Sequence, residues 1–230
     1  MKSSIYQTMY ISIIVQALTG LLDFFALFLK VPTEDKILID LVALELIVQV
    51  IEAIFYIWLL FSIKTLKNIT PNRYYDWIIT TPTMLITLSV YLLYLSSKEN
   101  KHPIKSSLWT VINDYWDEFV PILGLNMMML VFGYLGEIGY IEMYLAVILG
   151  FIAFFLSFAL IYKDFARLTE TGTNIFFVFT AIWSIYGIVA LLSHDVKNSI
   201  YNILDLVAKN FFGIYLAYVV YDINMNKSTK

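Results

Sequence analysis

The sequence contains no cysteine, and only 14% of its 230 residues are charged. The absence of cysteine excludes disulfides, thiolate metal sites and cysteine nucleophiles. No basic tract of the kind that binds nucleic acid is present, and the net charge is −3. By contrast, 60% of the residues are hydrophobic, where a soluble domain has about half. The composition therefore indicates an integral membrane protein.

Long apolar segments follow one another along the chain, separated by short polar breaks. Each is close to the ~20 residues that a spanning helix needs, and each is continuously apolar, unlike the alternating strands of a β-barrel. The first follows "MKSSIYQTMYIS" without a small-residue cleavage site, so we interpret it as a retained helix. We expect one all-α membrane domain over residues 1–230, a seven-transmembrane-helix bundle. Its predicted helices are 5–29, 37–63, 74–97, 119–136, 140–162, 172–193 and 199–222, with an interfacial segment at 106–118.

The charges in the polar breaks predict how the bundle is oriented. Cytoplasmic loops are enriched in lysine and arginine. An outside N-terminus and a cytoplasmic C-terminus place nine cations inside and five outside, and this is the orientation we predict. The inner nine are Lys30, Lys36, Lys98, Lys101, Lys105, Lys163, Arg167, Lys227 and Lys230, and the outer five are Lys2, Lys64, Lys67, Arg73 and Lys197.

Two apolar segments carry charges at bilayer depth. Lys209 lies about ten residues from either end of the last segment, too deep to reach the interface easily. Asp205 precedes it by four residues, so both project from one helix face. In "NRYYDWIITTP", Arg73 and Asp76 begin a stripe along one face of the third segment. Asp76 and Asp205 could therefore flank the Lys209 cation; the alternative is a structural ion pair.

Three motifs carry a family resemblance. "RYYDWIITTP" resembles the third-helix motif of microbial rhodopsins, "LDLVAK" resembles their retinal-lysine motif, and "WSIYG" resembles their sixth-helix motif. The resemblance implies that Lys209 carries retinal, all-trans in the dark, as a Schiff base with Asp76 and Asp205 as counter-ions. It also implies a photoreceptor and not an enzyme, with no metal site. The implied retinal pocket comprises Trp77, Thr80, Thr81, Met129, Gly133, Trp183 and Tyr186. Because Thr80 lies beside Asp76, we expect it to be a partner of that carboxylate; the alternative is an ordinary helix hydroxyl bonded to its own backbone.

Two positions depart from the pattern of an outward proton pump. Thr87 occupies the usual place of the proton donor, and a hydroxyl cannot deliver a proton at neutral pH. Lys197 occupies a position that resembles one outer release carboxylate. A donor elsewhere, such as Glu45, could restore pumping.

The second segment, "LVALELIVQVIEAIFY", indicates a different activity. Glu45, Gln49, Glu52 and Tyr56 form one polar stripe, which requires water or a polar partner. Acidic and amide groups around a water-filled route suit cations, and such glutamates are also a feature of channelrhodopsins. We expect Glu52 to be the central gate and Glu45 the inner constriction; the alternative is a buried hydrogen-bond network. The predicted ion pathway comprises Ser12, Glu45, Gln49, Glu52, Tyr56, Arg73, Lys197, Asn198, Asn202 and Asn210.

The pattern "KNSIYNILDLVAKN" in the last segment looks like the group 1 viral rhodopsins of giant algal viruses. Members of that group act as light-gated cation channels, so the resemblance implies passive conduction of monovalent cations after light isomerises retinal. An outward proton pump and a sensory photoreceptor with a separate partner are the alternatives. The expected partners are membrane lipid and monovalent cations or protons, and a homo-oligomer is a candidate assembly because dimers and rings are common in the family.

Overall fold

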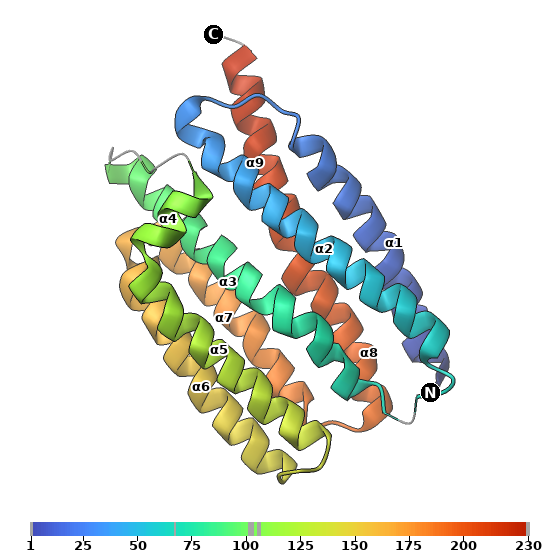
Figure 1. Ribbon diagram of the computed structural model, residues 1–230. Helices are drawn as coiled ribbons and strands as arrows, with labels where there is room; N and C mark the ends of the chain where they lie inside the picture. Colours follow the sequence, from blue (N-terminus) through green and yellow to red (C-terminus); the bar gives the residue numbers. More distant parts are fainter. Residues whose placement is uncertain (1, 67, 101–103, 105–106, 229–230) are drawn as a thin grey trace.

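The computed structural model describes residues 2–66, 68–100, 104 and 107–228, with side chains from residue 4 to residue 226. Within these ranges the chain is helical and contains no strand. The long helices of these ranges number seven when α8, η3 and α9 are taken as one. They form one bundle, and the two termini lie at opposite ends of it (Figure 1). The first six are α1 (Lys2–Ala26), α2 (Lys36–Ser62), α3 (Thr70–Asn100), α5 (Trp116–Glu137), α6 (Met143–Asp164) and α7 (Glu170–Val189).

The seventh helix is interrupted at Lys209. It consists of α8 (His194–Asp205), a π-helical turn η3 (Leu206–Asn210) and α9 (Phe211–Ser228). A π-turn inserts an extra residue into the helix and is often found at functional sites. The remaining short elements are η1 (Thr33–Asp35), α4 (Leu108–Asp114) and η2 (Ala166–Leu168).

The bundle has the surface of a membrane protein. By length and composition, six described spans could cross a bilayer: Ser4–Ala26, Thr70–Asn100, Trp116–Glu137, Met143–Leu168, Glu170–Val189 and His194–Asn226. The remaining long helix, α2, is not among these six spans; it contacts both α1 and α3. Large apolar side chains point outward along the bundle, for example Phe61, which is 79% exposed. Such a surface is stable only against lipid.

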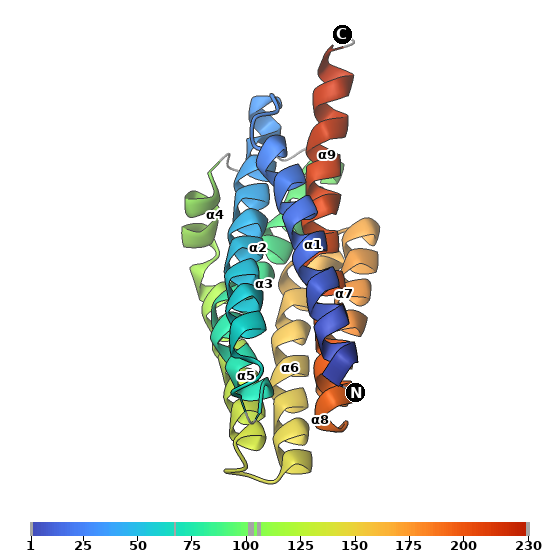
Figure 2. The same cartoon turned by 90° about the vertical axis from the view of Figure 1, so that its right-hand side faces the viewer.

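The interior is divided into a polar and an apolar half. Buried polar side chains gather where α1, α2, α3, α8 and η3 meet, and include Ser12, Glu52, Arg73 and Asn202. Buried aromatic side chains fill the space between α3, α5, α6 and α7. Turning the bundle shows α1 and α9 running beside each other, on the polar side (Figure 2). Lys209 lies between the two halves.

The seven predicted helices are confirmed, with differences at their ends. The third begins at Thr70 and continues to Asn100, because polar residues extend it beyond its apolar run. The predicted interfacial segment contains the short helix α4, in which Trp109 is 70% exposed.

Two of the cations counted as outer are not loop charges. Arg73 is 0% exposed and Lys197 only 6% exposed, and both bind carboxylates inside the bundle. The side chains of Lys2, Lys67, Lys101, Lys105, Lys227 and Lys230 lie outside the described residues. The orientation in the membrane stays a prediction.

Candidate functional site

A buried lysine surrounded by carboxylates forms the centre of the candidate site. Lys209 extends from η3, and its ammonium Nζ donates a hydrogen bond to Asp76 Oδ2 of α3. Glu52 Oε1 of α2 and Asp205 Oδ1 of α8 each lie 3.9 Å from the same nitrogen. The sequence predicts two carboxylates here, and the structure places three. Glu52, the predicted central gate, is close enough to Lys209 to act on its charge.

Arg73 is the second cation of this cluster. Its Nη1 donates to Asp205 Oδ2 at 3.2 Å, and its Nε donates to Asn198 Oδ1 at 3.1 Å. Nη2 donates to the side-chain oxygen of Asn202. Arg73 is thus a direct partner of Asp205. With both cations and all three carboxylates ionised, the cluster would carry one excess negative charge.

Two tyrosines fix the orientation of Asp205. The Tyr56 hydroxyl donates to Oδ2 at 2.8 Å, and the Tyr186 hydroxyl donates to Oδ1 at 2.9 Å. With Arg73, they satisfy both oxygens of a carboxylate that is 0% exposed. Asp76 is less constrained, since its Oδ1 has no hydrogen-bond partner among the described residues. Asp76 can therefore accept a further proton or hydrogen bond, whereas both oxygens of Asp205 already accept hydrogen bonds.

The predicted contact between Thr80 and the Asp76 carboxylate is wrong. The Thr80 hydroxyl donates to the backbone carbonyl oxygen of Asp76 at 3.0 Å. A threonine in a helix commonly satisfies its hydroxyl in this way, one turn back along its own backbone. Thr87 likewise donates to the Thr83 carbonyl oxygen, at 3.1 Å.

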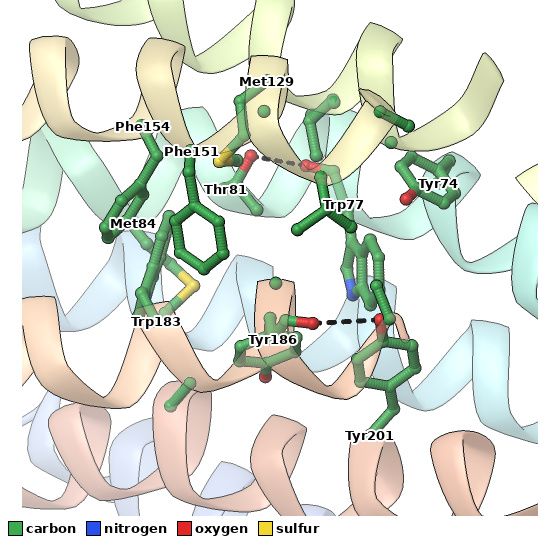
Figure 3. A pocket seen from close by; sticks show the side chains of 18 of the residues that line it. Tyr74, Trp77, Thr81, Met84, Met129, Phe151, Phe154, Trp183, Tyr186 and Tyr201 are labelled. Carbon is green, nitrogen blue, oxygen red and sulfur yellow. Dashed lines mark hydrogen bonds between the residues drawn. The ribbon is translucent and has the colours of Figure 1, made fainter. Parts of the chain in front are cut away.

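An aromatic cavity leads away from Lys209 between α3, α5, α6 and α7 (Figure 3). Of the predicted pocket residues, Trp77, Thr81, Met129, Gly133, Trp183 and Tyr186 line it, whereas Thr80 is not part of its lining. The sequence reasoning missed other lining residues, among them Met84, Phe151, Phe154 and Tyr201. Trp77 packs edge-on against Tyr186 and Tyr201, with ring centroids 5.7 Å and 5.3 Å apart. Asn126 lies behind the wall and donates to the Thr81 hydroxyl at 2.9 Å.

Two glycines let aromatic rings reach the cavity. A Cβ at Gly187 would lie 2.6 Å from Phe151 Cζ, and a Cβ at Gly133 would overlap the Tyr74 hydroxyl. Both rings therefore pack directly on helix backbone. The result is an apolar space with flat aromatic walls (Figure 3), whose lining includes the primary amine of Lys209. These residues fit a conjugated apolar aldehyde that the amine can hold covalently.

Several predicted pathway residues contact one another, whereas Lys197 lies apart from them. Ser12 donates to the Asn202 carbonyl oxygen at 3.1 Å, and Asn202 reaches back to the Thr8 hydroxyl at 2.8 Å. Lys197 instead points to the end of α5, where it binds Glu137 at 2.7 Å. The prediction that Lys197 lines the polar interior is therefore wrong.

A second polar cluster lies between α1, α2 and the seventh helix. The Thr19 hydroxyl contacts the side-chain oxygens of both Gln49 and Asn210. Gln49 in turn donates to Asp23 Oδ2. Gln49 and Asn210 are predicted pathway residues; Thr19 and Asp23 were missed. A signal was present, because Ser12, Gln16, Thr19 and Asp23 have the same spacing as the polar stripe that begins at Glu45.

A seven-helix membrane bundle, with a buried lysine facing carboxylates at the end of an aromatic cavity, defines a retinal protein. The comparison of families agrees: the bacteriorhodopsin-like protein family matches residues 4–223, and the chain belongs to that family. It is a microbial rhodopsin, an integral multi-pass membrane protein that binds retinal.

Solved structures support the same fold. The viral rhodopsin OLPVRII is 28% identical, with a TM-score of 0.79 over 95% of this chain and 98% of that chain. Acetabularia rhodopsin I is 18% identical, with a TM-score of 0.75 over 97% and 96% of the two chains. The proton pumping rhodopsin AR2 from the marine alga Acetabularia acetabulum is 19% identical, with a TM-score of 0.72 over 97% and 96%. The last two show the fold alone. No curated protein sequence matches the chain.

Proposed function

We propose that this protein is a light-gated channel for monovalent cations. The observation that carries the proposal is a row of buried polar side chains on the side of the bundle formed by α1, α2 and the seventh helix. It passes from the Arg73 cluster, past Glu52 and Lys209, to the cluster around Gln49. Buried polar groups are costly in a membrane and usually mark a route for water and ions.

Retinal bound at Lys209 would supply light absorption and a light-driven change of shape. The chain's own residues then set what this change acts on. Lys209 would hold the cofactor through Nζ, with Asp76 and Asp205 as its counter-ions. Asp76 is the better proton acceptor of the two, because one of its oxygens is free while both oxygens of Asp205 are occupied.

Glu52 suits the role of central gate. It is 0% exposed, and both of its oxygens lack a hydrogen-bond partner among the described residues. Its attachment to the cluster is electrostatic, through Lys209 at 3.9 Å. A carboxylate held mainly by one nearby cation is released when that cation moves or loses its charge. A change at Lys209 would thus free Glu52 to rearrange and admit water.

Glu45 supports the runner-up, an outward proton pump. This carboxyl group is 0% exposed, and its two oxygens have no hydrogen-bond partner in the described part of the chain. It could serve as the donor that Thr87 cannot be. We favour the channel because buried polar side chains also follow α1, at Ser12, Gln16, Thr19 and Asp23, and because "KNSIYNILDLVAKN" resembles the group 1 viral rhodopsins.

The test is the light-induced current of voltage-clamped cells that express the full chain with retinal. A channel predicts a current that reverses sign as the voltage is stepped through the cation equilibrium potential. A pump predicts an outward current at every accessible voltage. Negligible current with normal visible absorbance would favour the sensory photoreceptor.

Lys209→Ala is the control for the cofactor site. Removing the amine eliminates the attachment point while leaving the aromatic cavity in place. The purified variant, reconstituted with retinal, should show no visible absorption band. A variant that remained coloured to the same extent as the wild type would contradict the assignment of Lys209.

A further inference from the structure

A second cavity opens on the lipid-facing surface of the bundle, beside the aromatic cavity. It is a groove between α7 and the seventh helix, lined by side chains from residues 174–183 and 207–215. Four of its lining residues are exposed: Asn174, Val178, Phe211 and Tyr215. Val178 and Phe211 are 59% and 62% exposed, near the middle of two membrane-spanning segments. The groove is therefore open to the hydrocarbon core of the bilayer.

The aromatic cavity has no comparable opening. None of the described residues that line it is exposed. Lys209, to which we assign the retinal, is only 2% exposed. Retinal is apolar and therefore dissolves in the hydrocarbon core of the bilayer. To reach the Lys209 amine from there, it has to pass a wall of buried side chains.

One wall separates the groove from the aromatic cavity. Trp183 and Ala208 line both spaces, so at these two residues the wall is a single side chain thick. Figure 3 shows Trp183 at the edge of the aromatic cavity. Ala208 contributes only a methyl group and directly precedes Lys209. Close packing restrains a core side chain, and a ring that borders empty space on two sides displaces fewer neighbours when it moves.

Trp183 also brings a polar atom to this wall. It is 8% exposed, and its Nε1 has no hydrogen-bond partner among the described residues. Most buried polar groups in native proteins have such a partner. An indole N–H can only donate a hydrogen bond, and the aldehyde oxygen of retinal can accept one. The wall therefore carries an unused donor for the single polar atom of the molecule that has to pass it.

We propose that retinal enters the protein from the bilayer through this groove and passes the wall at Trp183 and Ala208 to reach Lys209. The groove suits a polyene because its buried lining is apolar, as at Phe179 and Phe212, and covering apolar surface is favourable. The inference depends on retinal binding and not on the proposed channel function. It would hold equally for a proton pump or a sensory photoreceptor.

The test is the rate of pigment regeneration in lipid nanodiscs. The retinal-loaded protein is bleached with hydroxylamine under light and washed, and all-trans retinal is then added. Val178→Trp fills the mouth of the groove and should regenerate roughly tenfold more slowly than the wild type, equivalent to about 1.4 kcal/mol on the barrier. Its final absorption band should match the wild type, because Val178 does not line the aromatic cavity.

Ile148→Trp is the matched control, since Ile148 is 57% exposed on α6 and lies outside the groove. It should regenerate at the wild-type rate. Adding Phe211→Ala to Val178→Trp removes a ring from the mouth of the groove and should restore part of the rate. Adding Phe177→Ala instead should not, because Phe177 is 56% exposed on α7 but does not line the groove.

Equal rates in Val178→Trp and Ile148→Trp would overturn the entry route and leave the groove to lipid acyl chains only. A slower rate in Ile148→Trp alone would place entry beside α6 and overturn it as well. Because regeneration is measured without an ion gradient, its outcome is separate from that of the photocurrent. A photocurrent that fails to reverse would refute the channel and leave the entry route standing.

Discussion

Replacing Arg73 with glutamine removes one charge from the centre of the polar cluster and retains a hydrogen-bonding side chain. The guanidinium is 0% exposed and donates to Asp205 at 3.2 Å and to the side chain and carbonyl oxygen of Asn198. Glutamine can replace one of these bonds. It cannot compensate the charge of Asp205, which would stay buried.

The expected loss of stability follows from the geometry. Two unit charges 3.2 Å apart attract by about 5 kcal/mol at an effective dielectric constant of about 20. Removing one partner of a buried pair typically costs about 3–5 kcal/mol. Tyr56 and Tyr186 still donate to Asp205 in the variant, so we expect the lower value, about 3 kcal/mol. If most of this loss falls on unfolding, the protein should unfold roughly a hundred times faster.

The assay is the loss of visible absorbance on heating in the dark at one fixed temperature. Arg167→Gln is the matched control, since Arg167 is exposed on η2 and should bleach at the wild-type rate. The double variant Arg73→Gln/Asp205→Asn removes both charges of the pair and should bleach more slowly than Arg73→Gln alone. If Arg73→Gln bleached at the wild-type rate, or if the double variant bleached as fast as Arg73→Gln alone, the ion-pair reasoning would be refuted.

Two further substitutions test the walls of the site and the corrected position of Lys197. Gly187→Ala places a methyl group against Phe151 and should push that ring into the cavity. Pigment formation with added retinal should therefore be slower than in the wild type. Gly124→Ala is the control: it has open space around it and should form pigment at the wild-type rate. Equal rates for both would contradict the described packing. Lys197→Gln leaves Glu137 buried without its cation and should lower thermal stability by about 3 kcal/mol. The photocurrent of this variant should reverse at the wild-type voltage, because Lys197 points away from the row of buried polar side chains. A shifted reversal potential would place Lys197 on the ion pathway.

The sequence predicts the helices and the core of the site well because both depend on local patterns. Seven apolar runs specify seven helices, and the spacing of Asp205 and Lys209 puts both on one face. The motif around Asp76 then supplies the facing carboxylate. These features require no knowledge of how one helix is rotated against another.

The remaining contacts depend on how each helix is rotated against its neighbours, and the sequence predicts only some of them. Glu52 meets Lys209 only because α2 turns its polar stripe toward η3, and Lys197 pairs with Glu137 because its long side chain reaches the end of α5. Thr80 was wrongly assigned because its own backbone offers a nearer acceptor than the Asp76 carboxylate. Asp23 was overlooked because it stands near the end of an apolar run, where a carboxylate could also reach the interface.

The reversal potential of the photocurrent tests the central claim most directly. External Na⁺ is replaced by N-methyl-D-glucamine at constant pH on both sides of the membrane, in cells that express the full chain. Passive conduction of monovalent cations predicts that the reversal potential becomes more negative after the replacement. A light-induced current that stays outward at every voltage and does not respond to the replacement would contradict the channel and favour the proton pump.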